Sequence, residues 1–556
     1  MAVQDIFNNP TNEQRHELFY ESLNLSGRTE DYENIIKLLS PPPDILDYAA
    51  PKSLQNINIG IIGGGLAGLS AAYELRKLGA NITIFDAEGT RIGGRVYTYY
   101  FNNNRQYFGE FGAMRIPVSH ETTWHYINLF NINTESLVAP LSNNFIYAHE
   151  VRMRRDFTGK SIEENLYPLY SLTEEERRTP WNELVNYATD TMLYSLTPAQ
   201  RTEILKIMPY YSDEYADITK LSNRQVFEKL GLSQGFINLF SAVDPFAGAT
   251  LNISHEESMS GTYTQDFLNT YRIQNGMVNL PLAFINSLTN NSPPELSNLT
   301  NQLGKVNIKL GHIVNGLAQI SENYVNIQYS NPFGNNLTES FDLVLCTIPY
   351  STLREVELNP YFTDRKMQAI KELNYIDAQK TICLFNTRFW EENAPYGNVN
   401  GGISFTDLII QSIVYPPDHI RCANNNCSYL EPGVLIASYN LGLDSFRLSN
   451  QNQQRRLEII KRDVEKVHGT PPGYLDTLID SSKTVQWNNE QWSRGGFAVP
   501  YPGQKVVLAY NMLLPEYNNR VFFAGEHIST KPGWMQGSLQ TGKWAANQAA
   551  LFLNRN

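Results

Sequence analysis

The stretch IGIIGGGLAGLSAAYELRKLGANITIFDAEGTRIGGR, residues 59–95, places three consecutive glycines between a short apolar run and a longer amphipathic one. The β-branched residues of 57–62 are typical of a strand, and the apolar residues of 66–78 recur at helical spacing. Strand character then returns over 82–85. This order predicts a βαβ unit.

The glycines of this unit indicate what it binds. Gly63 permits a tight turn, Gly65 lets the backbone approach a pyrophosphate at a helix N-terminus, and Gly68 allows the helix to pack closely on the strand. Asp86 ends the second strand, where a carboxylate can accept hydrogen bonds from an adenosine ribose. A packed βαβ unit without ligand is the alternative, but the coincidence of strand, turn, helix and acid favours a dinucleotide-binding fold.

Composition limits the classes of function. The 556 residues suffice for about three or four domains, and 42% of them are apolar. The net charge is −12 and basic residues form no runs, so nucleic acid is not an expected partner. The start of the sequence lacks the pattern of a signal peptide, and no stretch reaches membrane-spanning length. We therefore expect a soluble, cytoplasmic protein without membrane contact, and leave open a homodimer or a higher homo-oligomer.

The four cysteines are too few for a disulfide framework, and none forms a Cys-x-x-Cys pair. Cys422 and Cys427 share a polar loop, where a local disulfide is one option and two free thiols are the favoured one. No metal site is predicted.

Helical signals dominate two parts of the chain. Residues 11–39 have a helical pattern that ends before a run of three prolines. Between 119 and 262, Thr173 with Glu176 predicts a capping box, and Thr197 predicts an N-cap followed by a first-turn proline. Strand patterns follow this region. No second Gly-x-Gly-x-x-Gly follows a strand, which disfavours an enzyme that binds both FAD and NADPH in two such folds.

Six motifs together resemble the flavin-containing amine oxidase superfamily, and the Gly-x-Met-Arg segment resembles its L-amino-acid oxidase branch, which lies close to the L-amino-acid 2-monooxygenases. They are DAEGTRIGGR (86–95), FGEFGAMRIP (108–117), QNGMVNLP (274–281), DAQKTICLFNTRFW (377–390), QWNNEQWSRGGF (486–497) and FFAGEHISTKPGWMQGSLQTGKWAA (522–546). The resemblance runs in order from about residue 55 to the C-terminus.

The resemblance implies an α/β fold in which a Rossmann-like FAD-binding domain is assembled from separated segments, beside an antiparallel-sheet substrate domain and a helical domain. The expected divisions are an N-terminal helical arm (1–50), three FAD-binding segments (51–118, 263–350 and 484–556), a mainly helical domain at the substrate entrance (119–262) and a substrate-binding sheet domain (351–483).

The resemblance also assigns substrate residues. Arg115 matches the arginine that pairs with the substrate carboxylate, a task for which a permanently charged guanidinium fork is suited; a surface arginine paired with an acid is the alternative. Tyr415 matches a tyrosine whose hydroxyl joins Arg115, although a core tyrosine before a Pro-Pro turn fits the same letters. Trp534 matches an aromatic residue that borders both flavin and substrate.

Cofactor contacts follow from the same resemblance. FAD is implied, held noncovalently because Phe497 stands where some relatives carry a flavin-bonded cysteine. The implied contacts are Gly63, Gly65, Leu66, Ala67, Gly68, Asp86, Gly94, Arg95, Ala113, Met114, Arg115, Val314, Trp487, Gly525, Glu526 and Met535. For Trp487, an ordinary core position is the alternative.

The implied activity is oxidative deamination of an L-amino acid to a 2-oxo acid with O₂ as acceptor, releasing ammonia and H₂O₂. Lys380 matches the lysine that holds a water near flavin N5, where a cation favours electron transfer to oxygen; a strand lysine with its head in solvent is the alternative. An L-amino-acid 2-monooxygenase, which forms an amide, shares these motifs. An amine or polyamine oxidase ranks third, because its substrates lack the carboxylate with which Arg115 would pair. A flavin-binding scaffold without turnover is the non-enzymatic alternative.

The preferred side chain is not encoded in a motif. Asp244, Glu256, Glu257 and Asp377 are candidates to face a cationic side chain. However, Ser254 and Glu257 have the spacing of a capping box, which would engage that glutamate in the helix start.

Overall fold

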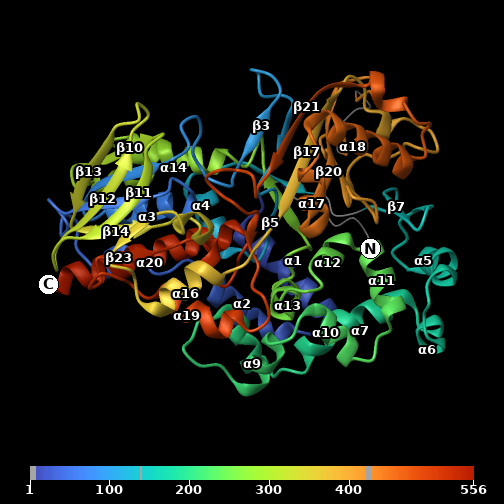
Figure 1. Cartoon of the computed structure of the whole chain (residues 1–556), viewed down its shortest axis with the longest axis horizontal. Helices are drawn as coiled ribbons and strands as arrows, with labels where there is room; N and C mark the ends of the chain where they lie inside the picture. The colour runs from blue at the N-terminus through green and yellow to red at the C-terminus, as the bar shows by residue number, and fades with distance from the viewer. Residues whose placement is uncertain (1–7, 138–140, 421–426, 556) are drawn as a thin grey trace.

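The computed structural model describes residues 8–137, 141–420 and 427–555. A parallel sheet of order β10-β2-β1-β14-β23 lies at the centre of one half of the molecule (Figure 1). Its strands are β1 (Asn58–Ile62), β2 (Asn81–Asp86), β10 (Val306–Leu310), β14 (Leu343–Cys346) and β23 (Val521–Phe523). Each neighbouring pair is parallel. The fold is therefore α/β, and its nucleotide-type sheet combines three widely separated parts of the chain, as predicted.

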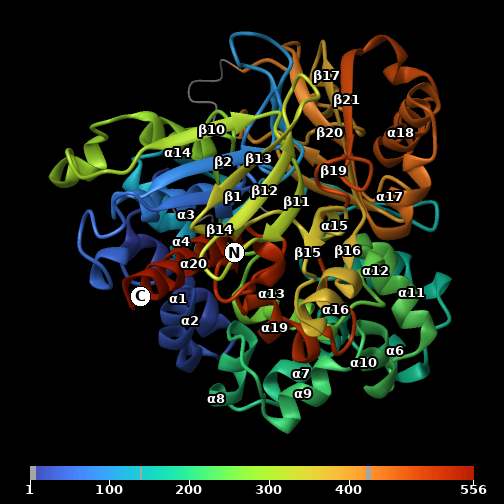
Figure 2. The same ribbon diagram turned by 60° about the vertical axis from the view of Figure 1, so that its left-hand side comes forward.

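Both faces of this sheet are covered. Helices α3 (Leu66–Arg76), α14 (Asn279–Thr289) and α20 (Met535–Arg555) pack on one face, where Ile61 and Ile84 point. An antiparallel layer packs on the other, where Ile62 and Phe85 meet Ile327 (Figure 2). That layer contains β11 (Ile313–Gln319), β12 (Val325–Ser330) and β13 (Asn336–Phe341), with β15 (Glu357–Asn359) parallel to β11 at its edge. Burial on both sides explains why β1 and β2 are apolar at consecutive positions.

A second, seven-stranded sheet has the order β21-β17-β20-β19-β18-β7-β8. It contains β7 (Phe145–Ala148), β8 (Val151–Arg154), β17 (Ala378–Phe385), β18 (Gly402–Thr406), β19 (Ser412–Tyr415), β20 (Gly433–Leu441) and β21 (Ile479–Gln486). One face packs on α18 (Gln453–His468), and the other looks toward the parallel-sheet half of the molecule. Strands β7 and β8 come from the segment 119–262, so this mainly helical segment also contributes to the sheet.

The helical part lies below both sheets in Figure 1. Its helices are α5 (Lys160–Asn165), α6 (Glu174–Arg178), α7 (Trp181–Tyr194), α8 (Pro198–Arg201), α9 (Asp213–Thr219), α10 (Asn223–Lys229), α11 (Gln234–Val243), α12 (Pro245–Ala249) and α13 (His255–Tyr263). The capping box of Thr173 with Glu176 is confirmed, and so is the N-cap at Thr197. The N-terminal arm forms α1 (Asn12–Leu25) and α2 (Tyr32–Leu39), which pack on the same core.

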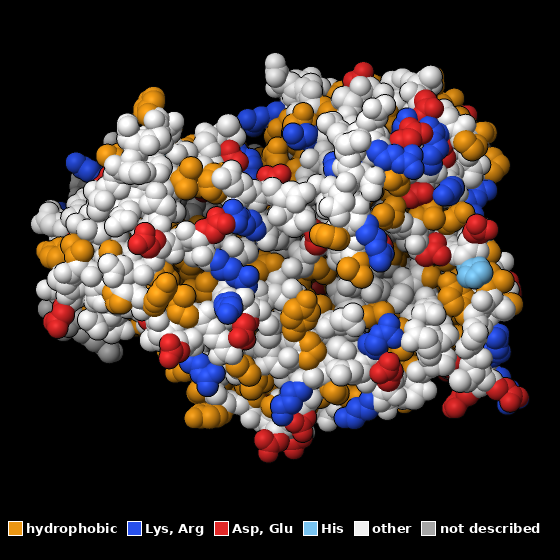
Figure 3. Space-filling view, in the orientation of Figure 1, with side chains coloured by type: hydrophobic (Ala, Val, Ile, Leu, Met, Phe, Trp, Pro, Cys, Tyr) orange, Lys and Arg blue, Asp and Glu red, His pale blue; other side chains and the backbone are white. Residues whose placement is uncertain are grey.

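The surface in Figure 3 carries interspersed acidic and basic side chains on the face viewed. None of the helices in the described ranges combines the length and the apolar character that a membrane span requires.

Candidate active site

A cavity of about 1040 Å³ opens at the carboxyl ends of β1 and β2, facing the seven-stranded sheet and the helical part. Gly63 and Asp86 line one end, Lys380 and Tyr439 lie in its sheet wall, and Asp244 belongs to its helical wall. Ligands of open α/β sheets bind at this edge. The volume reaches the upper end of the range of about 300–1,000 Å³ found for small-molecule pockets, so an extended cofactor and a small substrate fit together.

The glycine turn after β1 leaves room for a ligand at the start of α3. Gly63 has a φ of +104°, a conformation that L side chains rarely adopt. A Cβ added to Gly65, the N-cap, would meet no heavy atom within 4 Å outside its chain neighbours and would project into the cavity. A Cβ on Gly68 would lie 2.1 Å from the carbonyl oxygen of Gly63. The turn thus fits a pyrophosphate that approaches the N–H groups of the helix start.

Asp86 is the last residue of β2 and lies in the cavity wall. The N–H of Gly64 donates to its Oδ2 over 2.7 Å, and the N–H of Glu88 donates to its Oδ1 over 2.8 Å. Burial raises the pKa of Asp86, and these two donors counteract that effect. Each carboxylate oxygen keeps a second lone pair, so the group can still accept hydrogen bonds from ribose hydroxyls.

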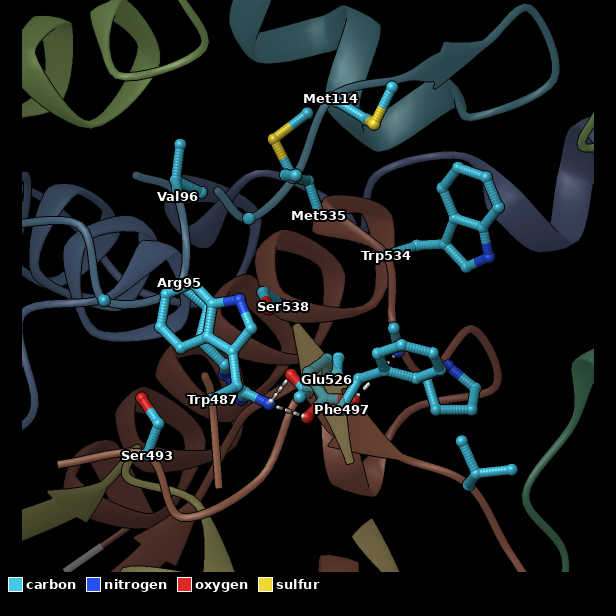
Figure 4. Close-up of a pocket in the computed structure, with 18 of the residues that line it drawn as sticks. Arg95, Val96, Met114, Trp487, Ser493, Phe497, Glu526, Trp534, Met535 and Ser538 are labelled. Carbon is cyan, nitrogen blue, oxygen red and sulfur yellow. Dashed lines mark hydrogen bonds and ion pairs between the residues drawn. The ribbon is translucent and has the colours of Figure 1, made fainter. Parts of the chain in front are cut away.

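Arg95 and Glu526 form an ion pair that joins the first and last segments of the parallel-sheet half. Arg95 Nη1 lies 2.7 Å from Glu526 Oε1, and the N–H of Gly533 donates to Glu526 Oε2 over 2.9 Å. In the view of Figure 4, Glu526 lies between Trp487 and Phe497. Because both of its oxygens are engaged, Glu526 holds the loop before α20 in place.

Two tryptophans form an aromatic part of the cavity wall. Trp487 is buried, and its Nε1–H donates to the Phe111 carbonyl oxygen over 3.0 Å. The Trp534 ring stands perpendicular to His120 at 5.0 Å between centroids and lies 5.9 Å from the Phe267 ring. The other predicted cofactor residues that line the cavity are Leu66, Ala67, Gly94, Ala113, Met114, Val314, Gly525 and Met535. Gly68 serves the packing of α3 instead.

Lys380 projects from β17 into the cavity wall and is 3% exposed, so the alternative of a solvated strand lysine is wrong. Its Nζ donates to the Gly112 carbonyl oxygen over 2.8 Å and to Met114 Sδ over 3.3 Å. Burial lowers the pKa of Lys380 to about 7, with Glu110 opposing the shift and Arg115 adding to it. The amine is thus placed to change its charge near neutral pH.

Arg115 lies in the wall close to Lys380 and is partly exposed toward the cavity. Burial lowers its pKa, which Tyr439 partly offsets. Its guanidinium carbon is 5.9 Å from the Phe267 ring centroid. Among the described residues, no carboxylate forms an ion pair with Arg115. A guanidinium in this position can bind an anion.

The prediction for Tyr415 requires correction. The residue reaches the cavity wall, but its hydroxyl lies 2.9 Å from both Ser404 Oγ and His468 Nε2 and belongs to the core beneath α18. Its neighbour Val414 belongs to the opposite face. The alternative, a core tyrosine, describes Tyr415 better.

Tyr439 is the tyrosine beside Arg115, and sequence reasoning missed it. It pairs with Lys380 across β17 and β20, and its ring centroid is 4.5 Å from Lys380 Nζ. A register shift between Thr381 and Ile382 alters which residues of the two strands share a face. Strand alternation within SYNL could have nominated Tyr439, but the pairing register is not readable from sequence.

The four candidate acids separate into two groups. Asp244 and Glu257 line the cavity. Glu256 instead pairs with Lys505 at 2.6 Å, and Asp377 accepts a hydrogen bond from Ser445 outside the cavity wall. The capping box predicted for Ser254 and Glu257 is wrong: the Ser254 hydroxyl donates to Thr219, and its N–H donates to the Pro500 carbonyl oxygen.

Of the cysteines, Cys346 and Cys383 are buried and free. Cys427 is disulfide-bonded, so the favoured prediction of a free thiol there is wrong. Cys422 lies outside the described residues.

Residues 66–550 match the model of a family described as flavin containing amine oxidoreductase. An L-amino-acid oxidase of Siganus canaliculatus is 26% identical, over 95% of this chain and 90% of that protein. A flavin-dependent L-tryptophan oxidase of Lentzea aerocolonigenes is 27% identical, over 87% of this chain and 96% of that protein. A solved structure of a putrescine oxidase double mutant has a TM-score of 0.66 at 15% identity, covering 89% of this chain and 98% of that one, and thus shares the fold.

Proposed function

The chain belongs to the flavin-containing amine oxidoreductase family, and we propose that it is an L-amino-acid oxidase that converts L-amino acids to 2-oxo acids with release of ammonia and H₂O₂. The observation that carries the proposal is Arg115, a guanidinium that faces the cavity without an acidic partner among the described residues. A plain amine would leave this cation buried and unpaired, which is unfavourable. The names of the two relatives agree with a substrate that carries a carboxylate.

The cofactor of the family is FAD, and the residues present fit it. The glycine turn would hold the pyrophosphate, Asp86 the adenosine ribose, and Glu526 with the Met535 backbone the ribityl chain and the pyrimidine end. Phe497 offers no thiol, so we propose noncovalent binding. Bound there, FAD would supply the two-electron redox chemistry that couples oxidation of the substrate Cα–H bond to reduction of O₂.

The protein's own groups position the substrate. Arg115 pairs with the α-carboxylate, and the Tyr439 hydroxyl donates to the same group, the role first expected of Tyr415. Trp487 and Trp534 shape an aromatic wall that limits water at the reacting carbon. Such positioning can supply several kcal/mol of the barrier, within the roughly 7–11 kcal/mol that orientation offers at most.

Lys380 acts after substrate oxidation. Its protonated amine provides a positive charge in a dry wall, and such a charge stabilises the negative charge that develops on oxygen. The neutral amine that exists above its pKa of about 7 loses this effect. Water then hydrolyses the released imino acid to the 2-oxo acid and ammonia.

A product assay tests the proposal. Purified protein incubated with a panel of L-amino acids and their D-enantiomers should release H₂O₂, ammonia and a 2-oxo acid from L-enantiomers. Amide and CO₂ as the main products would identify a 2-monooxygenase instead. Turnover of decarboxylated amines in preference to amino acids would contradict the role of Arg115.

A further inference from the structure

Glu257 faces the cavity from helix α13. Its carboxylate has no hydrogen-bond partner among the described residues, although the protein surrounds it. In a capping box the N–H of Ser254 would donate to the Glu257 carboxylate. Here that N–H donates to the Pro500 carbonyl oxygen over 3.0 Å instead. Gly261, one helical turn further on, also lines the cavity. Glu257 is therefore directed into ligand space.

The charges around Glu257 leave it without a cation. Glu256 pairs with Lys505 at 2.6 Å, and Asp266 pairs with Lys531 at 2.5 Å. These two pairs are neutral overall, so Glu257 is a third acid in the group. Burial and then the Glu256 carboxylate raise the pKa of Glu257 to about 8. A buried carboxylate of this kind gains most from a positively charged partner.

Glu257 and Arg115 belong to one continuous wall. A Cβ on Gly261 would lie 3.4 Å from the ring of Phe267, and the Phe267 centroid is 5.9 Å from the Arg115 guanidinium carbon. The Phe267 ring and one turn of α13 thus separate Arg115, which we propose binds the α-carboxylate, from Glu257, which lines the same cavity. This arrangement suits a ligand with a carboxylate at one end and a cation at the other.

We propose that Glu257 binds the ammonium or guanidinium group of the substrate side chain, so that L-amino acids with cationic side chains are the preferred substrates. This inference rests on the proposed function, in which Arg115 holds the α-carboxylate. Glu257 is a specificity residue and takes no part in the redox step.

Asp244, the other candidate acid that lines the cavity, fits this role less well. Asp244 is the N-cap of α12 and accepts a hydrogen bond from the Ala247 N–H over 3.1 Å. The positive charge of Arg155 also stabilises its carboxylate and lowers its pKa, against the effect of burial. The Arg155 guanidinium carbon lies 5.5 Å from the Phe405 ring centroid, and the Phe246 ring packs on Phe405 at 5.8 Å and on Tyr439 at 4.8 Å. The charge of Asp244 is therefore offset by Arg155, whereas Glu257 has no such cation of its own in the part of the chain that the structure describes.

The first test measures binding without turnover. The probe is 6-aminohexanoate, which has a carboxylate and a terminal ammonium but no α-amine, and hexanoate is its neutral-tailed match. By calorimetry on the FAD-loaded protein, 6-aminohexanoate should bind about 10- to 100-fold more tightly than hexanoate. In Glu257→Gln this ratio should fall toward one, while the affinity for hexanoate stays unchanged and so reports an intact site.

The second test measures specificity in turnover. In the wild type, kcat/KM should be higher for L-lysine or L-arginine than for L-norleucine. Glu257→Gln should raise KM about 10- to 100-fold for the cationic substrates and leave L-norleucine unaffected. The matched control is Asp244→Asn, which keeps a cap acceptor and removes the other candidate acid that lines the cavity. It should leave the preference for L-lysine over L-norleucine unchanged.

Three results would overturn the inference: equal binding of the two hexanoates by wild-type protein, equal losses for lysine and norleucine in Glu257→Gln, or loss of the preference in Asp244→Asn alone. Oxidation of neutral amino acids in preference to cationic ones contradicts the role of Glu257 and leaves the proposed oxidase intact. Absence of any amino-acid oxidation contradicts the oxidase, and the two hexanoates still decide the binding site.

Discussion

The glycine turn at residues 63–68 and the substrate-facing wall around Arg115 are specified in different ways. In the turn, every requirement falls within six consecutive residues and concerns the backbone: a positive φ at Gly63, an empty Cβ position at Gly65 and a close approach at Gly68. Such requirements act through residue type at fixed spacing. The turn can therefore be predicted from the sequence alone.

The substrate-facing wall has no such local unit. Arg115 follows β4 (Phe108–Glu110), Lys380 comes from β17, Tyr439 from β20 and Glu257 from α13. Their proximity depends on strand register and on how the helical part packs. A single side chain can accordingly be exchanged here without disturbing the fold, whereas in the turn Gly63 and Gly68 have no room for a side chain or no suitable backbone conformation.

The largest effect is expected for Gly65→Val. The backbone of Gly65 (φ −77°, ψ 177°) suits any residue, and the added side chain points into the cavity. The variant should fold with a Tm close to that of the cofactor-free wild type, but should bind no FAD and lack all activity. Flavin absorbance of the purified protein and a thermal melt measure the two properties separately.

Gly68→Val is the matched control within the same turn. Its Cβ would collide with the backbone at Gly63, so the Tm of the cofactor-free protein should fall strongly. If Gly65→Val proved equally unstable, the separation between ligand space and packing inside the turn would be wrong.

Lys380→Met should slow the oxygen step. Loss of one preorganised charge is worth about 2.7–4 kcal/mol, or roughly 10²- to 10³-fold in rate. Stopped-flow measurements should show slow reoxidation by O₂, with flavin reduction changed much less. Unaltered reoxidation would mean that Lys380 is not the group that assists oxygen.

The pH profile adds a second readout for Lys380. The charge on its amine is present below the pKa of about 7 and is lost above it. Reoxidation by the wild type should therefore slow as the pH rises through about 7, and Lys380→Met should abolish this dependence. A profile that is identical in both proteins would assign the titration to another group, such as the buried Glu110, whose pKa burial raises to about 7 as well.

Arg115→Met should raise KM for L-amino acids by about 10- to 150-fold, because a charge-assisted hydrogen bond contributes about 1.5–3 kcal/mol. Turnover of the decarboxylated amine, which has no carboxylate to lose, should not decline. Steady-state kinetics on an amino acid and its amine make the comparison, and parallel losses for both would remove Arg115 from the carboxylate site.

Sequence reasoning succeeded where a local pattern determines structure. The βαβ unit, the separated strands of the parallel sheet and the caps at Thr173 and Thr197 are present as predicted. It failed where tertiary contacts compete with a local pattern. Ser254 has the spacing of a capping box, yet the Pro500 carbonyl takes its N–H and frees Glu257 for the cavity. The resemblance likewise assigned Tyr415 to the substrate carboxylate, but the residues around it do not determine which face of β19 its side chain occupies.

The smallest effects are expected for two tyrosine variants, and they should differ in kind. Tyr439→Phe keeps the ring against Lys380 and removes the hydroxyl beside Arg115, so KM should rise about 2- to 12-fold with little change in Tm. Tyr415→Phe leaves Ser404 and His468 without a buried hydroxyl partner, which should lower the free energy of unfolding by about 1–3 kcal/mol. KM should then stay unchanged, because that hydroxyl lies on the far side of the sheet from Arg115. Kinetics and chemical denaturation of both variants decide between the two assignments: a raised KM in Tyr415→Phe, with none in Tyr439→Phe, would restore Tyr415 as the partner of Arg115 and show that the bound state rearranges this strand.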